Sequence, residues 1–233
     1  MSTSIDRSLL ISAATALGAP VDDKIANTLD TFFGLVASTN EKFNLTAITD
    51  AASFTEKHLI DSLAAADLIP ADARVADIGA GAGFPSVPLA VVRPDISVTA
   101  IDSTEKKANF ISQAAKELGL NNLSSVAGRA EELTSLRDTF DVVSARAVAS
   151  LPVLCELALP LLKKGGLFLA YKTDLSEVAS AKHALTVLGG TTKGAKEYAL
   201  PSGDKRAVIV IEKTRPTPAA YPRRYSKIKS SPL

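Results

Sequence analysis

Short apolar runs alternate with stretches of helical periodicity through the central part of the chain. Each run of Val, Ile, Leu and Ala between positions 74 and 172 is followed by a segment whose apolar residues recur every three or four positions. This alternation predicts parallel strands joined by helices. The expected strands are 74–78, 96–101, 121–127, 140–145 and 167–172. The expected helices are 85–92, 104–118, 151–162 and 175–188, with a short helix or turn at 130–137.

The pattern changes at both ends of this region. Two strand-like runs, 191–200 and 206–213, are joined by Pro201-Ser-Gly-Asp204, and so short a link implies an antiparallel hairpin. Helical periodicity covers 5–18, 22–40 and 51–66, and Asp22 is expected to cap the second of these helices. We therefore expect an α/β fold, a Rossmann-like doubly wound sheet of seven mostly parallel strands that ends in an antiparallel hairpin. A helical extension (1–66), a core (67–213) and a C-terminal tail (214–233) would divide the chain.

A glycine-rich turn follows the first predicted strand directly. Gly79, Gly81 and Gly83 alternate with alanines, and glycine permits positive φ and a close approach of backbone to a ligand. The next strand ends at Asp102, an acid that would accept hydrogen bonds from the hydroxyls of a ribose. The two features together predict a site for an adenosine-containing cofactor.

The spacing of the turn indicates which cofactor. A dinucleotide fingerprint is G-x-G-x-x-G, but here the third glycine comes one residue early and Phe84 holds the dinucleotide position. Pro85 removes an N–H donor from the start of the helix. These features favour S-adenosylmethionine (SAM), which has no phosphate, with S-adenosylhomocysteine (SAH) as product. The closing hairpin is also common in SAM-dependent methyltransferases and unusual in dehydrogenases.

Composition excludes several other classes of protein. Apolar residues make up 46% of the 233 positions, and no apolar run reaches the length of a membrane span. The N-terminus lacks the pattern of a signal peptide. The single cysteine, Cys155, excludes an internal disulfide and is expected to be buried. We expect a cytoplasmic protein that is not bound to a membrane, and no metal, because no His/Cys cluster has ligand spacing.

Charge is uneven along the chain. Residues 213–233 hold six basic residues and no acidic residue, a net charge of +6. The rest of the chain holds 20 basic and 25 acidic residues, a net charge of −5, and the two parts sum to the net charge of +1. A basic, proline-spaced tail indicates contact with nucleic acid, although a solvated, disordered terminus is an equally open interpretation. The RNA-binding candidates in this tail are Arg223, Arg224, Lys227 and Lys229.

Taken together, the motifs resemble the bacterial 16S rRNA guanine-N7 methyltransferase G family, historically called glucose-inhibited division protein B. The resemblance covers nearly the whole chain from about residue 20. The matching segments are Phe43–Thr46, His58–Ser62, Asp77–Pro85, Pro88–Ala90, Asp102-Ser with Lys106, Lys107 and Phe110, Arg129–Glu131, Asp141–Ala147 with Ser150-Leu151, Gly165-Gly166 with Lys172, and Tyr221–Arg224. The tail departs from the family, which usually continues Tyr-Pro-Arg-Arg with a Gly-x-Pro pattern, whereas this chain continues with Tyr225-Ser-Lys.

The resemblance implies methylation of N7 of one guanine in 16S rRNA, with rRNA or the small ribosomal subunit as partner. We expect a monomer. By motif, the SAM contacts would fall on Gly79, Phe84, Ala130, Glu131 and Arg146, with Asp102, Ser103 and Thr104 on the ribose side, and Gly81 and Gly83 completing the turn.

Guanine N7 has a free lone pair at neutral pH, so methyl transfer needs positioning rather than a general base. Arg146 follows strand 140–145, and is expected to bind the SAM carboxylate or the base O6; a salt bridge with Asp77 or Glu131 is the structural alternative. Asn44 and Lys172 are the other catalytic candidates. The structural alternatives are a capping asparagine in a loop for Asn44 and a solvated lysine for Lys172. His58 is expected to be structural.

Two other activities stay open. A SAM-dependent methyltransferase acting on another RNA or on a small molecule would share the same fold. An NAD-dependent oxidoreductase is opposed by Phe84 in place of the third dinucleotide glycine.

Overall fold

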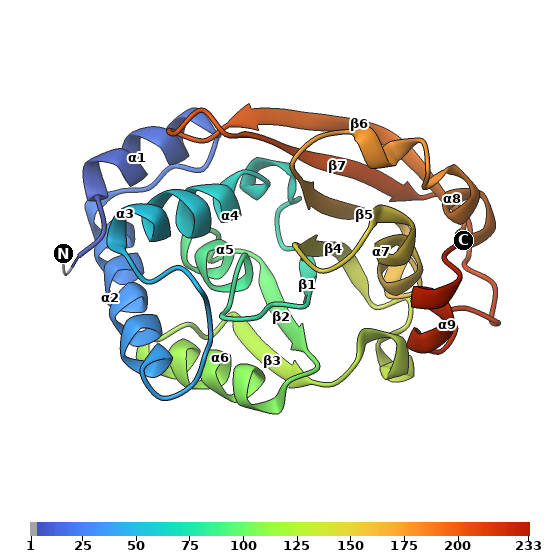
Figure 1. Ribbon diagram of the computed structural model, residues 1–233, viewed down its shortest axis with the longest axis horizontal. Helices are drawn as coiled ribbons and strands as arrows, with labels where there is room; N and C mark the ends of the chain where they lie inside the picture. Colours follow the sequence, from blue (N-terminus) through green and yellow to red (C-terminus); the bar gives the residue numbers. More distant parts are fainter. Residues whose placement is uncertain (1–3) are drawn as a thin grey trace.

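The computed structural model describes residues 4–233, so the first three residues of the expected extension 1–66 lie outside it. Within the described residues, seven strands form one sheet in the order β3-β2-β1-β4-β5-β7-β6 (Figure 1). The first five strands in this order are parallel, while β7 pairs antiparallel with both β5 and β6. The strands are β1 Arg74–Ile78, β2 Ser97–Asp102, β3 Leu123–Ala127, β4 Phe140–Arg146, β5 Leu162–Lys172, β6 Gly190–Ala199 and β7 Lys205–Lys213. The α/β class and the closing hairpin are therefore confirmed.

Helices cover both faces of this sheet. They are α1 Arg7–Ala16, α2 Asp23–Asn40, α3 Ala51–Phe54, α4 Asp61–Leu63, α5 Ser86–Val92, α6 Glu105–Glu117, α7 Leu151–Ala158, α8 Lys182–Leu188 and α9 Tyr225–Ser230. A π-helical turn, Thr55–Ile60, joins α3 to α4, and this continuous stretch corresponds to the helix expected at 51–66. The predicted cap is confirmed, since the carboxylate of Asp22 accepts from the amide of Ile25 at 2.7 Å.

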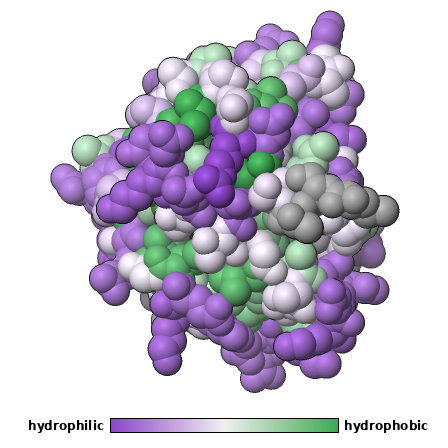
Figure 2. All heavy atoms as spheres, turned by 90° about the vertical axis from the view of Figure 1, so that its left-hand side faces the viewer, coloured by the Kyte–Doolittle hydropathy of each residue, from purple (hydrophilic) through white to green (hydrophobic). Residues whose placement is uncertain are grey.

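The N-terminal helices cover one face of the sheet together with α5 and α6. Phe32 and Phe54 are fully buried and pack on Phe84 at centroid distances of 5.3 and 5.4 Å. Tyr171 on β5 donates its hydroxyl to the carbonyl of Ser62 at 2.8 Å, which ties the helical segment to the sheet. Figure 2 shows the face that carries these helices as mostly hydrophilic, with separate hydrophobic patches. Their apolar sides are therefore used in covering the sheet.

The opposite face is covered by α7, α8 and the C-terminal segment. All residues of α7 are buried, including Cys155, as expected. The C-terminal segment crosses this layer and ends in α9, which lies beside α7 (Figure 1). Ile228 of α9 is fully buried, so the segment after β7 is packed on the core.

Three predicted helices differ from the structure. The helix expected at 175–188 is divided into a 3₁₀ turn, Ser176–Val178, and α8, Lys182–Leu188. The helix expected at 151–162 ends at Ala158, because Pro160 supplies no N–H for a further turn. The segment 130–137 forms two short 3₁₀ turns, Ala130–Glu132 and Thr134–Leu136. The element boundaries thus shift by a few residues, while their order is as predicted.

This topology fixes the place of a ligand. The strand order reverses between β1 and β4, and ligands of open α/β sheets bind beyond the carboxyl ends of strands at such a switch point. The glycine turn, Asp102 and Arg146 all lie at these carboxyl ends.

Candidate functional site

The glycine turn uses its own amides internally. Gly79 and Ala80 donate to the carbonyl of Ile101, while Gly83 and Phe84 donate to that of Ala80, at 2.8–3.1 Å. A pyrophosphate site needs free N–H groups at this position. The turn therefore fits a ligand without phosphate better than a dinucleotide, which agrees with the interpretation of Phe84 and Pro85.

Asp102 orders the same turn. One carboxylate oxygen accepts from the amide of Gly81 at 2.9 Å and the other from the amide of Thr104 at 2.8 Å. Each oxygen keeps a second lone pair that can accept from a hydroxyl. Asp102 is 7% exposed. The structure therefore gives it a role in shaping the turn, which was not predicted, in addition to its expected contact with a ribose.

A cavity of about 300 Å³ lies between these segments. It is large enough for a cofactor. Gly81 has φ +59°, and a Cβ added there would meet only the carbonyl of Gly79, at 3.8 Å, so its backbone stands open to a ligand. Within residues 4–233, buried Oε1 of Glu131 accepts no hydrogen bond and lies 3.8 Å from the Arg129 guanidinium. An open backbone and an unpaired buried acceptor fit the adenosine and hydroxyl donors of SAM. The lining residues are Ile78, Gly79, Ile101, Ser103, Gly128, Arg129, Ala130, Glu131, Val148, Leu157 and Tyr225.

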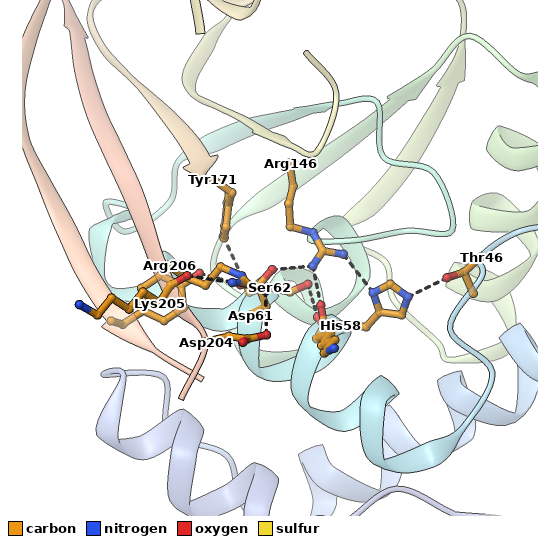
Figure 3. Close-up of polar contacts among 11 residues, drawn as sticks. Thr46, His58, Asp61, Ser62, Arg146, Tyr171, Asp204, Lys205 and Arg206 are labelled. Atoms are coloured by element: carbon orange, nitrogen blue, oxygen red, sulfur yellow. Dashed lines mark hydrogen bonds and ion pairs between the residues drawn. The ribbon is translucent and has the colours of Figure 1, made fainter. Parts of the chain in front are cut away.

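Arg146 ends β4 and points into a network of polar contacts (Figure 3). Its Nη1 lies 2.7 Å from Oδ2 of Asp61 and 2.8 Å from the carbonyl of Lys57, and the two side chains are 14% and 10% exposed. Asp61 also accepts from the hydroxyl of Tyr198 at 2.8 Å. The sequence offered Asp77 and Glu131 as ion-pair partners of Arg146. Both were wrong, because the partner, Asp61, comes from the N-terminal helical segment.

His58 connects this network to the aromatic core. Its Nδ1 accepts from Nη2 of Arg146 at 3.3 Å, because a guanidinium can only donate, so its Nε2–H donates to Oγ1 of Thr46 at 2.8 Å. Burial, and then the charge of Arg146, lower the pKa of His58 to about 3. The imidazole is therefore neutral at physiological pH and a weak base, in keeping with its expected structural role.

Phe84 lies under this network and has little contact with solvent. It is 5% exposed, its ring stacks on that of His58 at 4.2 Å and 11°, and the guanidinium of Arg146 lies 5.6 Å from its centroid. Phe84 is thus surrounded by protein, and both His58 and Arg146 pack against its ring.

A second cavity of about 420 Å³ lies on the other side of the loop after β4. Ala147 lines it, whereas the next residue, Val148, lines the first cavity, so the two hollows are separated by this loop. Lys57, Arg146, Lys172 and Arg206 give this second cavity a basic lining. Lys172 is not a solvated lysine: its Nζ binds Glu177 at 2.9 Å and the carbonyl of Ala149 at 2.7 Å.

Asn44 is exposed and lies outside both cavities, and it does not cap a helix. Asn40, the last residue of α2, orders this loop instead, because its Oδ1 accepts from the amides of Leu45 and Thr46 at 2.7 and 3.0 Å. The loop reaches the second cavity through Ile48.

Asp77 was predicted only as a possible ion-pair partner of Arg146, and its hydrogen bonds to two serines were missed. It is fully buried and accepts from the hydroxyls of Ser86 and Ser144, the latter at 2.9 Å. Burial raises the pKa of Asp77 to about 6. The folded protein therefore binds this proton at pH values at which the unfolded chain has lost it.

This shift predicts a pH dependence of stability. The unfolded carboxyl titrates near its model value of 3.8, so the contribution of Asp77 is full below that pH and is lost as pH rises through about 6. Asp77→Asn should therefore gain stability relative to the unmodified protein as pH rises from 4 to 7, by about 3 kcal/mol for a shift of two units. Chemical denaturation at a series of pH values measures this difference.

Asp50→Asn provides the opposite case. The amide of Ser53 lowers the pKa of Asp50, so this variant should lose stability relative to the unmodified protein as pH rises. A flat difference curve for Asp77→Asn would contradict the assignment of a raised pKa.

The C-terminal cations divide into two groups. Arg223 donates from Nε and Nη2 to Glu156 at 2.8 and 2.5 Å, and Glu156 is fully buried in α7. Arg223 is thus held within the protein where an exposed phosphate-binding residue was expected. In the described part of the chain, Arg224, Lys227 and Lys229 are exposed and take part in no ion pair.

Across residues 4–233, no three His, Cys, Asp or Glu side chains gather closely enough to hold a metal ion. None of the helices described has both the length and the apolar character needed to cross a membrane.

The sheet order, the closing hairpin and the cavity beside the glycine turn define a SAM-dependent methyltransferase of the Rossmann-like class. A solved SAM-dependent methyltransferase from Aquifex aeolicus has the same fold, with a TM-score of 0.55 at 15% identity over 76% of this chain and 98% of that chain.

The family is shown by sequence. The model for rRNA small subunit methyltransferase G matches residues 25–205. The ribosomal RNA small subunit methyltransferase G of Lactococcus lactis subsp. cremoris is 42% identical over 96% of this chain and 97% of its own length. That of Deinococcus radiodurans is 43% identical over 99% and 94%. The chain belongs to the rRNA small subunit methyltransferase G family.

Proposed function

We propose that this protein transfers the methyl group of SAM to N7 of a specific guanine in 16S rRNA. The observation that supports this most is the pair of adjoining cavities on either side of the loop after β4, one fitted to SAM and the other lined by basic residues. Relatives at 42–43% identity are named as methyltransferases of small-subunit rRNA. The choice of guanine N7 rests on the resemblance to the family.

SAM supplies an electrophilic methyl group on a sulfonium, and the residues of this chain would hold both reactants. Ser103, Ala130 and Glu131 line the first cavity together with Gly79 of the glycine turn, where they would hold the adenosine. Arg146 lies at the second cavity, where its guanidinium could bind the carboxylate of SAM or the O6 of guanine.

The proposed transfer proceeds in line and without a general base. The lone pair of N7 attacks the methyl carbon, the bond to sulfur breaks, and positive charge moves from sulfur to the purine. His58, whose pKa is lowered to about 3, is a weak base, in keeping with a step that needs no general base. N7 lies in the narrow major groove of an A-form helix, so the target base must be unpaired or taken out of the stack.

The direct test uses small ribosomal subunits from a strain that lacks the gene. We expect incubation with the protein and labelled SAM to produce 7-methylguanosine in 16S rRNA, identified by mass spectrometry of digested nucleosides. Label at a different base position, or only in another RNA or a small molecule, would favour the alternative methyltransferase.

RNA affinity provides a separate prediction. Replacing Arg224, Lys227 and Lys229 together with glutamine should weaken RNA binding and reduce the slope of log K against log salt by about 2, since each phosphate contact contributes about 0.7–0.9. Filter binding at several salt concentrations measures the slope. Deleting the whole tail would be a poorer test, because it also removes buried Ile228.

Lys24→Gln with Lys116→Gln is a suitable control, because both lysines are exposed on other helices. A slope that is unchanged in the triple variant, or reduced equally in this control, would count against a role of the tail in RNA binding.

A further inference from the structure

One wall of the cavity beside the glycine turn comes from the C-terminal segment. Tyr225, the first residue of α9, lines this cavity together with Ser103, Glu131 and Val148. The other lining residues lie at the ends of β1 and β2, follow β1, β2, β3 or β4, or belong to α7. Tyr225 is half-buried, so its side chain is fixed against the protein while part of it stays accessible.

Two contacts hold Tyr225 in this place. The guanidinium of Arg129 lies 5.3 Å from the centre of its ring, within the range of a cation–π contact. Ile228, one helical turn later, is fully buried against the layer that contains α7. Arg129 therefore contacts the ring itself, while Ile228 anchors the helix that carries it.

The segment before α9 is anchored by charge. Arg223 makes its ion pair with Glu156, and its own amide donates to the same carboxylate at 2.9 Å. Arg137 donates to the carbonyl of Tyr221 at 2.7 Å and also binds that of Thr217. Removing Arg223 would leave a buried carboxylate without compensation, so this anchor is not free to move away from the cavity.

Tyr225 lies directly after the tail segment that matches the family pattern. The resemblance to the family weakens directly after Tyr221-Pro-Arg-Arg224, where relatives usually have a Gly-x-Pro pattern and this chain has Tyr225-Ser-Lys. The cavity is otherwise lined on this side by apolar groups such as Ile101, Ala130 and Leu157. An aromatic ring among them offers a flat surface for a purine.

We propose that Tyr225 is a cofactor-binding residue, whose ring packs against the adenosine of SAM and closes the cavity from the C-terminal side. The ion pair of Arg223 with Glu156 is the anchor that positions it. This inference rests on the proposed function for the identity of the ligand, and adds to it a binding residue from outside the sheet.

The test uses the absence of tryptophan from the chain. In Tyr225→Trp the indole is the only one, so titration with SAH should change its fluorescence intensity and emission maximum. Ser230→Trp is the matched control, because Ser230 is exposed on the same helix and lies outside the cavity. We expect the control signal to stay constant through the same titration.

Affinity is measured separately by calorimetry with SAH, without RNA. Tyr225→Ala should bind SAH about two- to ten-fold more weakly, the effect expected when an aromatic contact is lost, whereas Tyr225→Phe should bind like the unmodified protein. Equal affinity in Tyr225→Ala, with no fluorescence response in Tyr225→Trp, would overturn the inference and leave the proposed function standing. Failure of the unmodified protein to bind SAH would overturn both.

Discussion

Arg146→Ala should lower kcat/KM for methylation of 16S rRNA by about 100-fold or more, the loss typical of removing one preorganised donor from a reaction site. The guanidinium lines the second cavity, where it lies 5.6 Å from the ring centre of Phe84 and contacts His58 and Asp61. Its loss removes the donor expected to orient the SAM carboxylate or the guanine O6. Initial rates with small ribosomal subunits measure the effect.

A second variant separates this role from a purely structural one. Arg146→Ala alone leaves buried Asp61 with only the longer ion pair to Arg206, at 3.8 Å, and the hydroxyl of Tyr198, so part of its effect will be on stability. Arg146→Ala with Asp61→Asn removes both charges and keeps an acceptor for Tyr198. We expect this pair to recover stability but not activity. Activity near that of the unmodified protein in the double variant would show that Arg146 only holds the helix.

The second large effect is expected at Arg223. Arg223→Ala should lower the free energy of unfolding by about 3–5 kcal/mol, because it leaves the fully buried carboxylate of Glu156 unpaired. The neighbouring Arg224 is exposed and takes part in no ion pair with the described residues, so Arg224→Ala should change stability by less than about 0.5 kcal/mol. Urea denaturation followed by circular dichroism compares the two.

Glu156→Gln combined with Arg223→Ala completes the comparison. Without the carboxylate the loss of the guanidinium should cost less, so the double variant should be more stable than Arg223→Ala alone. Equal destabilisation by Arg223→Ala and Arg224→Ala would mean that the tail is held by its backbone and apolar contacts rather than by this ion pair.

The sequence predicted the sheet well because the relevant signal is local. The central strands β1, β2 and β4 are short, mostly buried apolar runs, and glycine or proline stands in turns beside strands, as at Gly79 and Pro201. Helix ends were less accurate, and the π-helical turn at Thr55–Ile60 leaves no mark in apolar periodicity. Such details depend on what the segment packs against.

The candidate site was predicted in part for the same reason. The residues after β1, β2 and β4 lie together because parallel strands bring their carboxyl ends to one edge, and Gly79, Ser103, Ala130 and Glu131 do line one cavity. Periodicity could not reveal that Arg146 pairs with Asp61, because these residues are 85 positions apart. The same applies to Arg223, which composition alone made an RNA-binding candidate.

The ion pair between Glu156 and Arg223 also orders the events of chain synthesis. Arg223 follows Glu156 by 67 residues, so translation delivers α7 long before its charge partner exists. A carboxylate is too costly to bury alone, and closing so long a loop is slow. The nascent protein should therefore assemble its N-terminal helices and parallel strands first, and complete the packing of α7 only after β6 and β7 have been made.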